Sequence, residues 1–445
     1  MKKPKARGKK PSKKHVGVFI FLFINGTFGF LLLSPYIPNY IGEYLDNQLL
    51  NSIDNRIIDS RTAIFALNIK YINGTAVNDT PIYYNLSSHD FVFGGNLFSF
   101  NACGSPSDNA NYKNFFKSIF NLGIIRFYWA EYEPIQGDTA YRDAINDDII
   151  TWGNQSGVET KGHPLAWVHP AGQPGWLPED ENLVLDLLKT RIQDILTRYQ
   201  NKTSMWDVVN EPMHYTPFAG QSTYDYTANC LEWAAEVDPD AYLMVNDFGI
   251  LGHDFGGGPF YNLMDSLKKN GVPISAMGFQ AHEYRTDWIP ATEMWDTLEA
   301  YSDLDIPIHI TELMITSAPL PITNSWKKGL WSEENQGEYL ERLYKVCFAH
   351  PSVEGIIYWD FWDGTAWMEE SGFFREDWSP KPVYTRLSNL INNEWHTEGN
   401  DVSDASGALG FNGFFGTYNI SIPSLGWSGL VDFTMGGSRT INITI

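Results

Sequence analysis

The sequence predicts a (β/α)8 barrel with a small accessory β unit, and three observations support this fold class. Between residues 91 and 393, short apolar runs alternate with amphipathic stretches of helical spacing. This alternation is typical of parallel strands that are each followed by a crossover helix. Segments of alternating polarity at both ends of the chain predict further strands. The chain of 445 residues is long enough for one domain of about 300 residues and a smaller unit.

Eight predicted strands and eight predicted helices make up the barrel. The strands are Phe91–Phe98, Ile124–Trp129, Thr160–Trp167, Met205–Glu211, Tyr242–Phe248, Ala276–His282, Ile306–Glu312 and Gly355–Phe361. The helices follow them in turn at Asn111–Asn121, Tyr141–Asn154, Asn182–Gln200, Tyr224–Val237, Phe260–Asn270, Thr292–Tyr301, Glu333–Ala349 and Pro382–Asn393. Because this fold carries its chemistry at the carboxyl ends of the strands, functional residues are expected there.

The segments that flank the barrel predict the accessory β unit. Thr62–Tyr71 and Thr80–Leu86 alternate apolar and polar residues around Asn73-Gly74, which predicts a β-hairpin. Near the carboxyl terminus the strand-like segments are Gly407–Phe411, Gly416–Ile422 and Thr440–Ile445. We therefore expect residues 61–90 and 396–445 to form one small β unit beside a barrel of residues 91–395.

The amino terminus has the pattern of a membrane anchor. Residues 1–14 hold eight Lys or Arg and no acid, and the eighteen residues 16–33 carry no charge. A span needs about 20 apolar residues, and the basic residues predict that residues 1–15 are cytoplasmic and the body external. A cleaved secretion signal is the alternative. Residues 34–60 are expected to be a tether of mixed polarity with a short helix at Ile41–Leu50.

Charge and cysteine content exclude several classes of function. Of the 31 Lys and Arg, 23 lie outside the basic terminus and face 53 Asp and Glu, a net charge of −30. Such a body repels nucleic acid, so a neutral polysaccharide is a better partner. We expect no cofactor or metal, because the sequence has no metal-ligand motif and no phosphate-binding loop. We also expect a monomer. Cys103, Cys230 and Cys347 allow at most one disulfide or three isolated thiols.

Two glutamates at strand ends carry the predicted chemistry. Glu211 ends the fourth predicted strand and Glu312 the seventh, so both are expected at one rim of the barrel. Two carboxyl groups across a cleft suit glycoside hydrolysis, in which one protonates the departing oxygen and the other is ionised. Burial and mutual repulsion would separate their pKa values. A separation of about 5 to 5.5 Å gives retention of anomeric configuration, and about 6.5 to 9.5 Å gives inversion.

Polar and aromatic residues at the other strand ends fit a sugar ligand. Amides and imidazoles hydrogen-bond hydroxyl groups, and Trp faces cover the apolar side of a pyranose ring. The candidate substrate-binding residues are His163, Trp167, Asn210, Gln280, His282, Trp359 and Trp367.

Four segments carry a resemblance to a known family. They are Lys161–Trp167 (K-G-H-P-L-A-W), Trp206–Pro212 (W-D-V-V-N-E-P), Gly271–His282 and Ile310–Leu313 (I-T-E-L). Together they resemble glycoside hydrolase family 10, the endo-β-1,4-xylanases, over about Phe91–Asn393. The resemblance implies a (β/α)8 barrel and retaining hydrolysis, with Glu211 as general acid/base and Glu312 as nucleophile. It also implies that Asn210 donates to the sugar 2-hydroxyl and that the other candidates line the sugar sites.

Two places differ from the family pattern. The family usually has Glu-Asn and then Lys where this chain has Ile124, Ile125 and Tyr128, and an Asp where it has Met314. The expected activity is that of a retaining endo-β-1,4-glycanase with xylan as the default substrate. The alternatives are a related barrel glycosidase acting on another β-glycan, and a non-catalytic carbohydrate-binding protein of the cell surface.

Overall fold

The computed structural model describes residues 37–282 and 285–445, and its centre is a closed parallel sheet. Neighbouring strands pair in the order β5-β4-β3-β11-β10-β9-β8-β7-β6, and β5 also pairs with β7, which closes the barrel. The strands are β3 Val92–Asn96, β4 Leu122–Arg126, β5 Glu159–His163, β6 Ala166–Trp167, β7 Met205–Asn210, β8 Tyr242–Asp247, β9 Ala276–Phe279, β10 Ile308–Leu313 and β11 Val353–Tyr358. The predicted (β/α)8 barrel is confirmed, with β5 and β6 as two pieces of one barrel strand.

The outer helices overlap the predicted ones, although α2 begins and ends five residues before the predicted Asn111–Asn121. They are α2 Pro106–Phe116, α4 Ala140–Ser156, α5 Glu181–Tyr199, α6 Thr223–Val237, α7 Pro259–Lys269, α8 Ala291–Ser302, α9 Glu333–Ala349 and α10 Pro382–Asn389, with a short α3 at Trp129–Tyr132. Four of them begin with a side chain that accepts a backbone N–H of the first turn, namely Ser105, Asp180, Ser222 and Ser332. Such caps fix where these helices start.

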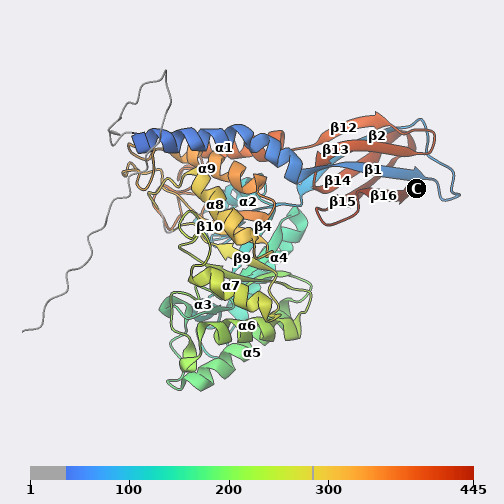
Figure 1. Cartoon of the computed structure of the whole chain (residues 1–445). Coiled ribbons are helices and arrows are strands. Elements are labelled where there is room, and N and C mark those ends of the chain that lie inside the picture. Colours follow the sequence, from blue (N-terminus) through green and yellow to red (C-terminus); the bar gives the residue numbers. More distant parts are fainter. Residues whose placement is uncertain (1–36, 283–284) are drawn as a thin grey trace, which may run out of the picture.

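Residues 37–61 form one long helix rather than the expected tether with a short helix. Helix α1 spans Ile37–Arg61 and packs along α8 and α9 on the outside of the barrel (Figure 1). Its buried face includes Ile53, Ile57 and the fully buried Asp46. Asp46 accepts hydrogen bonds from Thr292 and from the Trp326 indole. A charged residue on the packed face obscures the helical period in the sequence.

The accessory β unit contains two sheets built from both flanks of the barrel. One sheet has the order β13-β1-β16 and the other β12-β2-β14-β15. The strands are β1 Thr62–Lys70, β2 Pro81–His89, β12 Glu398–Val402, β13 Ala408–Phe414, β14 Gly416–Ile422, β15 Trp427–Phe433 and β16 Thr440–Thr444. The unit projects from one side of the barrel, beyond the end of α1 (Figure 1).

The expected hairpin of Thr62–Tyr71 with Thr80–Leu86 is wrong. The chain does turn at Asn73-Gly74, and Lys70 bridges Ala76. Strand β1 then pairs with β13 and β16, whereas β2 pairs with β12 and β14 in the other sheet. Phe65 explains the arrangement, because its ring packs between the sheets against a set of aromatic side chains: Phe411, Phe415, Tyr418 and Phe433.

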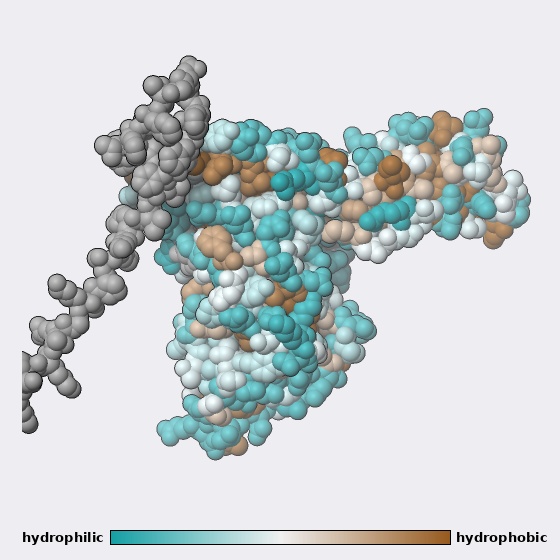
Figure 2. Space-filling view, in the orientation of Figure 1, coloured by the Kyte–Doolittle hydropathy of each residue, from teal (hydrophilic) through white to brown (hydrophobic). Residues whose placement is uncertain are grey.

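The predicted tail at residues 1–15 and anchor at residues 16–33 lie outside the described residues. Of the helices between residues 37 and 445 that are described, none combines the length and apolarity needed to cross a bilayer. The three cysteines are buried free thiols, so the possible disulfide is not formed. The face of the molecule in Figure 2 is mostly hydrophilic, with small scattered hydrophobic patches.

Candidate active site

A cleft of about 550 Å³ opens at the carboxyl ends of the barrel strands, and both predicted glutamates line it. Glu211 directly follows β7, and Glu312 is the penultimate residue of β10. Both side chains are largely buried, with Glu211 9% and Glu312 5% exposed. The two acids therefore meet in one enclosed space although about a hundred residues separate them in the sequence.

Three amide side chains connect the two carboxylates. Gln280 donates from Nε2 to Oε1 of Glu211 at 3.1 Å and to Oδ1 of Asn210 at 3.2 Å. Asn246 donates from Nδ2 to the same Asn210 oxygen at 2.8 Å and to Oε1 of Glu312 at 2.7 Å. This chain of hydrogen bonds holds both acids in fixed orientations across the cleft.

The backbone is strained at two of these strand ends. Glu211 has φ = 54° and Ala281 has φ = 61°, the left-handed region that residues other than glycine seldom occupy. The N–H of Glu211 donates to the Asn246 carbonyl at 2.7 Å and keeps the turn in place. Such strain is common where a side chain must be aimed at a reaction centre.

The surroundings of Glu211 favour its protonated form. Burial raises the pKa of its carboxyl, and the negative charge of Glu312 raises it further. Hydrogen bonds from Gln280 and from the Trp167 indole, the latter 2.9 Å from Oε2, partly oppose this rise. A carboxyl with a raised pKa is suited to carry a proton to a leaving group.

Glu312 is surrounded by hydrogen-bonding groups of a different kind. Its Oε2 lies 3.3 Å from Nε2 of His282, and its Oε1 lies 3.8 Å from Nε2 of His163. His282 also contacts the ring of Trp367 at 5.4 Å, at the exposed rim of the cleft. With the donor from Asn246, this cage can stabilise an ionised carboxylate.

His163 is positioned from below by a buried ion pair. Its Nδ1 lies 2.8 Å from Oδ2 of Asp207, whose other oxygen lies 2.8 Å from Nζ of Lys161. Burial alone would raise the pKa of Asp207, but Lys161 and His163 outweigh it and the pKa is lowered. The ionised Asp207 therefore anchors the ring that faces Glu312.

Aromatic rings form the walls of the cleft. Trp359 contacts Phe98 and His163, and Tyr128 contacts His163 and Trp167. Trp167 in turn stacks on His169, with ring centroids 4.5 Å apart. Flat rings separated by polar groups are what a sugar chain requires.

All nine residues predicted for the site lie together in this region. Eight of them line the cleft, and the ninth, Gln280, hydrogen-bonds Glu211. The sequence did not reveal Lys161 and Asp207 as a pair, or Tyr128 as a residue that lines the cleft. The signal for Asp207 was present, because a charged residue stands inside the apolar run that ends at Glu211.

The departures from the family pattern have a structural explanation. Ile124 and Met314 pack with Trp359, Met368 and Ile357 in one apolar cluster inside the barrel. Two positions usually occupied by polar residues in the family thus belong to the same apolar cluster as Trp359. His282 is held by Glu312 and Trp367.

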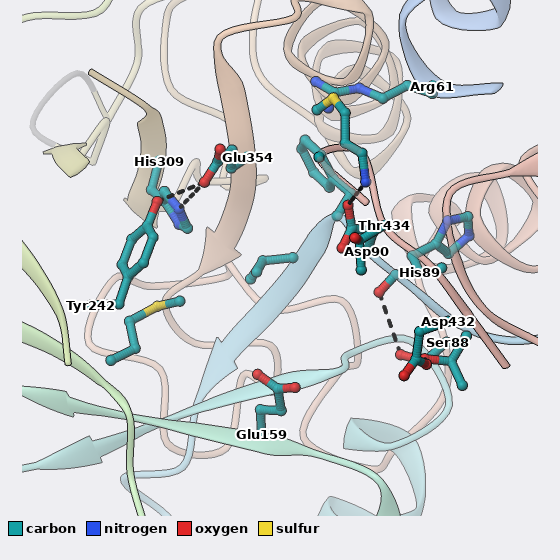
Figure 3. A pocket seen from close by; sticks show the side chains of 17 residues that line it. Arg61, Ser88, His89, Asp90, Glu159, Tyr242, His309, Glu354, Asp432 and Thr434 are labelled. Atoms are coloured by element: carbon teal, nitrogen blue, oxygen red, sulfur yellow. Dashed lines mark hydrogen bonds and ion pairs between the residues drawn. The ribbon is translucent and has the colours of Figure 1, made fainter. Parts of the chain in front are cut away.

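A second cavity, of about 540 Å³, lies at the opposite end of the barrel strands, against the β unit. Figure 3 shows His309 and Tyr242 directed at Glu354; the Tyr242 hydroxyl donates to Glu354 at 2.6 Å. Asp90, Glu159 and Asp432 line the same cavity. In the described part of the chain, no three His, Cys, Asp or Glu residues are grouped so that they could hold a metal ion.

A parallel barrel with two carboxyl groups in a polar, aromatic cleft defines the class of glycoside hydrolase barrels. The chain belongs to glycosyl hydrolase family 10, whose model matches residues 90–390. The endo-1,4-beta-xylanase 2 of Arabidopsis thaliana is 30% identical over 74% of this chain and 30% of its own. Xylanase 10B from Thermotoga petrophila, solved with xylobiose, matches 68% of this chain and 95% of its own with a TM-score of 0.56 at 23% identity.

One relative extends beyond the barrel. The anti-sigma-I factor RsgI6 of Acetivibrio thermocellus is 27% identical over 92% of this chain and 51% of its own. The chain thus spans about half or less of the length of these two curated relatives. A match over 92% of the chain reaches into the flanks of the barrel.

Proposed function

We propose that the protein is a retaining endo-β-1,4-glycanase that hydrolyses xylan. The observation that carries the proposal is the pair Glu211 and Glu312 in one cleft, linked by Gln280, Asn210 and Asn246. The relatives support the substrate, since several are named endo-1,4-beta-xylanases.

In the first step Glu312 attacks the anomeric carbon while Glu211 gives its proton to the departing oxygen. The glycosidic C–O bond breaks as the Glu312 ester bond forms, which leaves a glycosyl-enzyme and an ionised Glu211. In the second step Glu211 takes a proton from water, the water oxygen bonds to the anomeric carbon, and Glu312 leaves as a carboxylate. The raised pKa of Glu211 and the donors around Glu312 suit these two roles.

The test is turnover of an aryl β-xyloside and of xylan. Glu312→Ala should lower kcat at least about a thousandfold on both substrates, because no other carboxylate takes its place. Glu211→Ala should lower kcat less on an aryl glycoside than on xylan, because a good leaving group needs little protonation. Equal turnover by wild type and Glu312→Ala would refute the assigned nucleophile. Mass spectrometry of a trapped 2-fluoroglycosyl peptide containing Glu312 would test retention directly.

A second candidate is a non-catalytic carbohydrate-binding protein of the cell surface. The observation that favours it is the relative named as an anti-sigma factor, which matches 92% of this chain and so more than the barrel. Xylo-oligosaccharide binding without any turnover would support this candidate. A related glycosidase acting on another β-glycan would instead be revealed by a panel of β-linked polysaccharides.

We also propose that residues 16–33 anchor the protein in a membrane with the barrel outside, and that the body is a monomer. The uncharged run after a basic cluster supports the anchor. Cell fractionation with external protease should release the barrel from intact cells, and light scattering of the released body should give the mass of one chain. A barrel protected from protease, or a dimer mass, would contradict these proposals.

A further inference from the structure

One end of the cleft carries a single basic side chain. Among the described residues that line the cleft, Arg126 is the one Lys or Arg. It is the last residue of β4, and its neighbours at this end follow β3 and β11: Phe98, Ser99 and Thr365. Tyr215 and Phe248 line the end formed by the loops after β7 and β8. A sugar chain that fills the cleft therefore passes the Arg126 guanidinium at one end only.

The guanidinium is held in one orientation. Its Nη1 lies 2.8 Å from Oε2 of Glu131, and its plane lies over Phe98, with the central carbon 4.2 Å from the ring centroid. The ring of Tyr128 lies 5.7 Å from the same carbon. The side chain is still 27% exposed, so donors remain available to a ligand in the cleft. Fixing a long side chain in advance reduces the entropy lost on binding.

Glu131 does not neutralise this end of the cleft. The same Oε2 also lies 3.0 Å from Nη2 of Arg142, so one carboxylate is shared by two guanidinium groups. The three side chains together carry one net positive charge. Asp360 also lines the cleft; burial raises the pKa of its carboxyl, and hydrogen bonds from the Trp367 backbone and Asn96 and the charge of Arg126 oppose that rise only in part. A partly exposed cation here stands out in a chain with a net charge of −22.

We propose that Arg126 binds the carboxylate of an acidic side group on the sugar chain, so that the preferred substrate is a β-linked polysaccharide substituted with uronic acid. This inference rests on the proposed glycanase function and adds the class of substrate. A guanidinium presents two parallel N–H groups that match a carboxylate, and Arg is the residue best suited to such planar recognition.

The test compares the activity of each Arg126 variant on two substrates, one with uronic acid side groups and one without. Arg126→Gln should lower the ratio of kcat/KM on glucuronic-acid-substituted xylan to kcat/KM on unsubstituted xylo-oligosaccharides about tenfold. Arg126→Lys keeps the charge but loses the paired donors, so it should lower the ratio by a smaller factor. Raising the salt concentration should lower the ratio for the wild type, because the interaction is between charges near the surface.

Arg142→Gln is the matched control, because it removes the same charge from the same carboxylate partner but does not line the cleft. Its ratio should fall by less than that of Arg126→Gln, because the site loses one positive charge but keeps the paired donors of Arg126. An unchanged ratio in Arg126→Gln, or an equal loss in Arg142→Gln, would overturn the inference. If the wild type turned over neither substrate, the glycanase function would fail, and calorimetric binding of the two oligosaccharides would still measure the same preference.

Discussion

The protonation of Glu211 depends on a small number of named neighbours. Burial and the charge of Glu312 raise its pKa, while the donors Gln280 and Trp167 lower it. In the proposed mechanism Glu211 is the general acid and works only while protonated, so we expect the loss of its proton to set the alkaline limit of activity. Trp167→Phe removes one donor to the ionised form, so the pKa of Glu211 should rise and this limit should move to higher pH. The profile of kcat/KM against pH measures the shift.

Trp359→Phe provides the comparison, since Trp359 lines the cleft, whereas the side-chain donors to Glu211 are Trp167 and Gln280. It should lower kcat/KM without moving the alkaline limit. A limit that stays in place in Trp167→Phe, or moves down, would show that the indole does not act on the ionised carboxylate.

Asp207 contributes to stability as well as to the site. It is fully buried between Lys161 and His163, so Asp207→Asn leaves the Lys161 charge without its partner. We expect a loss of about 3 to 5 kcal/mol in the free energy of unfolding, measured with urea at neutral pH. The exposed Asp148→Asn should change it by no more than about 0.5 kcal/mol.

The pH dependence of this effect has a definite sign. The folded pKa of Asp207 is lowered, so its contribution is complete above the unfolded pKa and is lost as pH falls through the folded value. The difference between wild type and Asp207→Asn should therefore shrink below about pH 4. A difference that is constant into strong acid would mean that the carboxylate charge is not responsible.

At the scale of strands and helices, the sequence predicts what depends on local pattern. Each barrel strand is a short run buried on both faces, such as β7 or β10, and each is followed by an amphipathic helix. The same pattern places Glu211 and Glu312 at one rim. It does not predict which interior residues pair, because Lys161 and Asp207 are brought together by the pairing of β5 with β7.

The accessory strands show where local pattern fails. Alternating polarity in β1 and β2 indicates that each has one buried face, but it does not identify the partner strand. Their pairing is decided by residues more than three hundred positions away, in β13, β14 and β16. The sequence likewise did not identify Arg126, because its orientation depends on the Phe98 ring and the Glu131 carboxylate, which the fold brings next to it.

Arg61 joins three elements and supplies the next prediction. At the end of α1 its guanidinium donates to the carbonyls of Phe348, His350 and Val353, each at 2.6 Å. Burial lowers its pKa to about 10, so it is charged at neutral pH. Arg61→Met removes the donors to these carbonyls of α9, its C-cap and β11, and we expect the free energy of unfolding to fall by about 3 kcal/mol or more.

The exposed Arg56 of the same helix is the control. It lies over the Trp295 ring at 4.5 Å, and Arg56→Met should cost at most about 1 kcal/mol. Urea denaturation of both variants gives the comparison. Equal losses would mean that α1 is held by its apolar face and not by the link from Arg61 to α9.

Across the whole molecule, a column of buried polar groups runs from one end of the barrel towards the other. It begins at Glu312 in the cleft and continues through His163, Asp207 and Lys161. The charges of Lys161 and Asp207 also act on the pKa of His309, which burial lowers. His309 lies beside Glu354 at the second cavity, against the β unit (Figure 3). Buried polar and charged groups thus extend through the barrel interior, with the cleft at one end and the β unit at the other.

The β unit depends on both flanks of the barrel at once. Strand β1 pairs with β13 and β16, so a chain ending at residue 395 would expose Phe65, Leu67 and Ile69. By contrast, the solved xylanase 10B from Thermotoga petrophila is a barrel without this unit's share of the chain: the match covers 95% of that xylanase but 68% of this chain. We therefore expect residues 37–395 to aggregate, whereas residues 90–395 remain soluble.

The barrel fragment should nevertheless melt at a lower temperature than the full body, because it loses the packing of Ile53 and Ile57 and the Arg61 link. Light scattering distinguishes aggregate from monomer, and circular dichroism gives the melting temperatures. Removing one flank should thus do more damage than removing both, since half a β unit presents unpaired strands and an open apolar face. A monomeric fragment 37–395 that is more stable than 90–395 would show that the amino-terminal strands need no carboxyl-terminal partners.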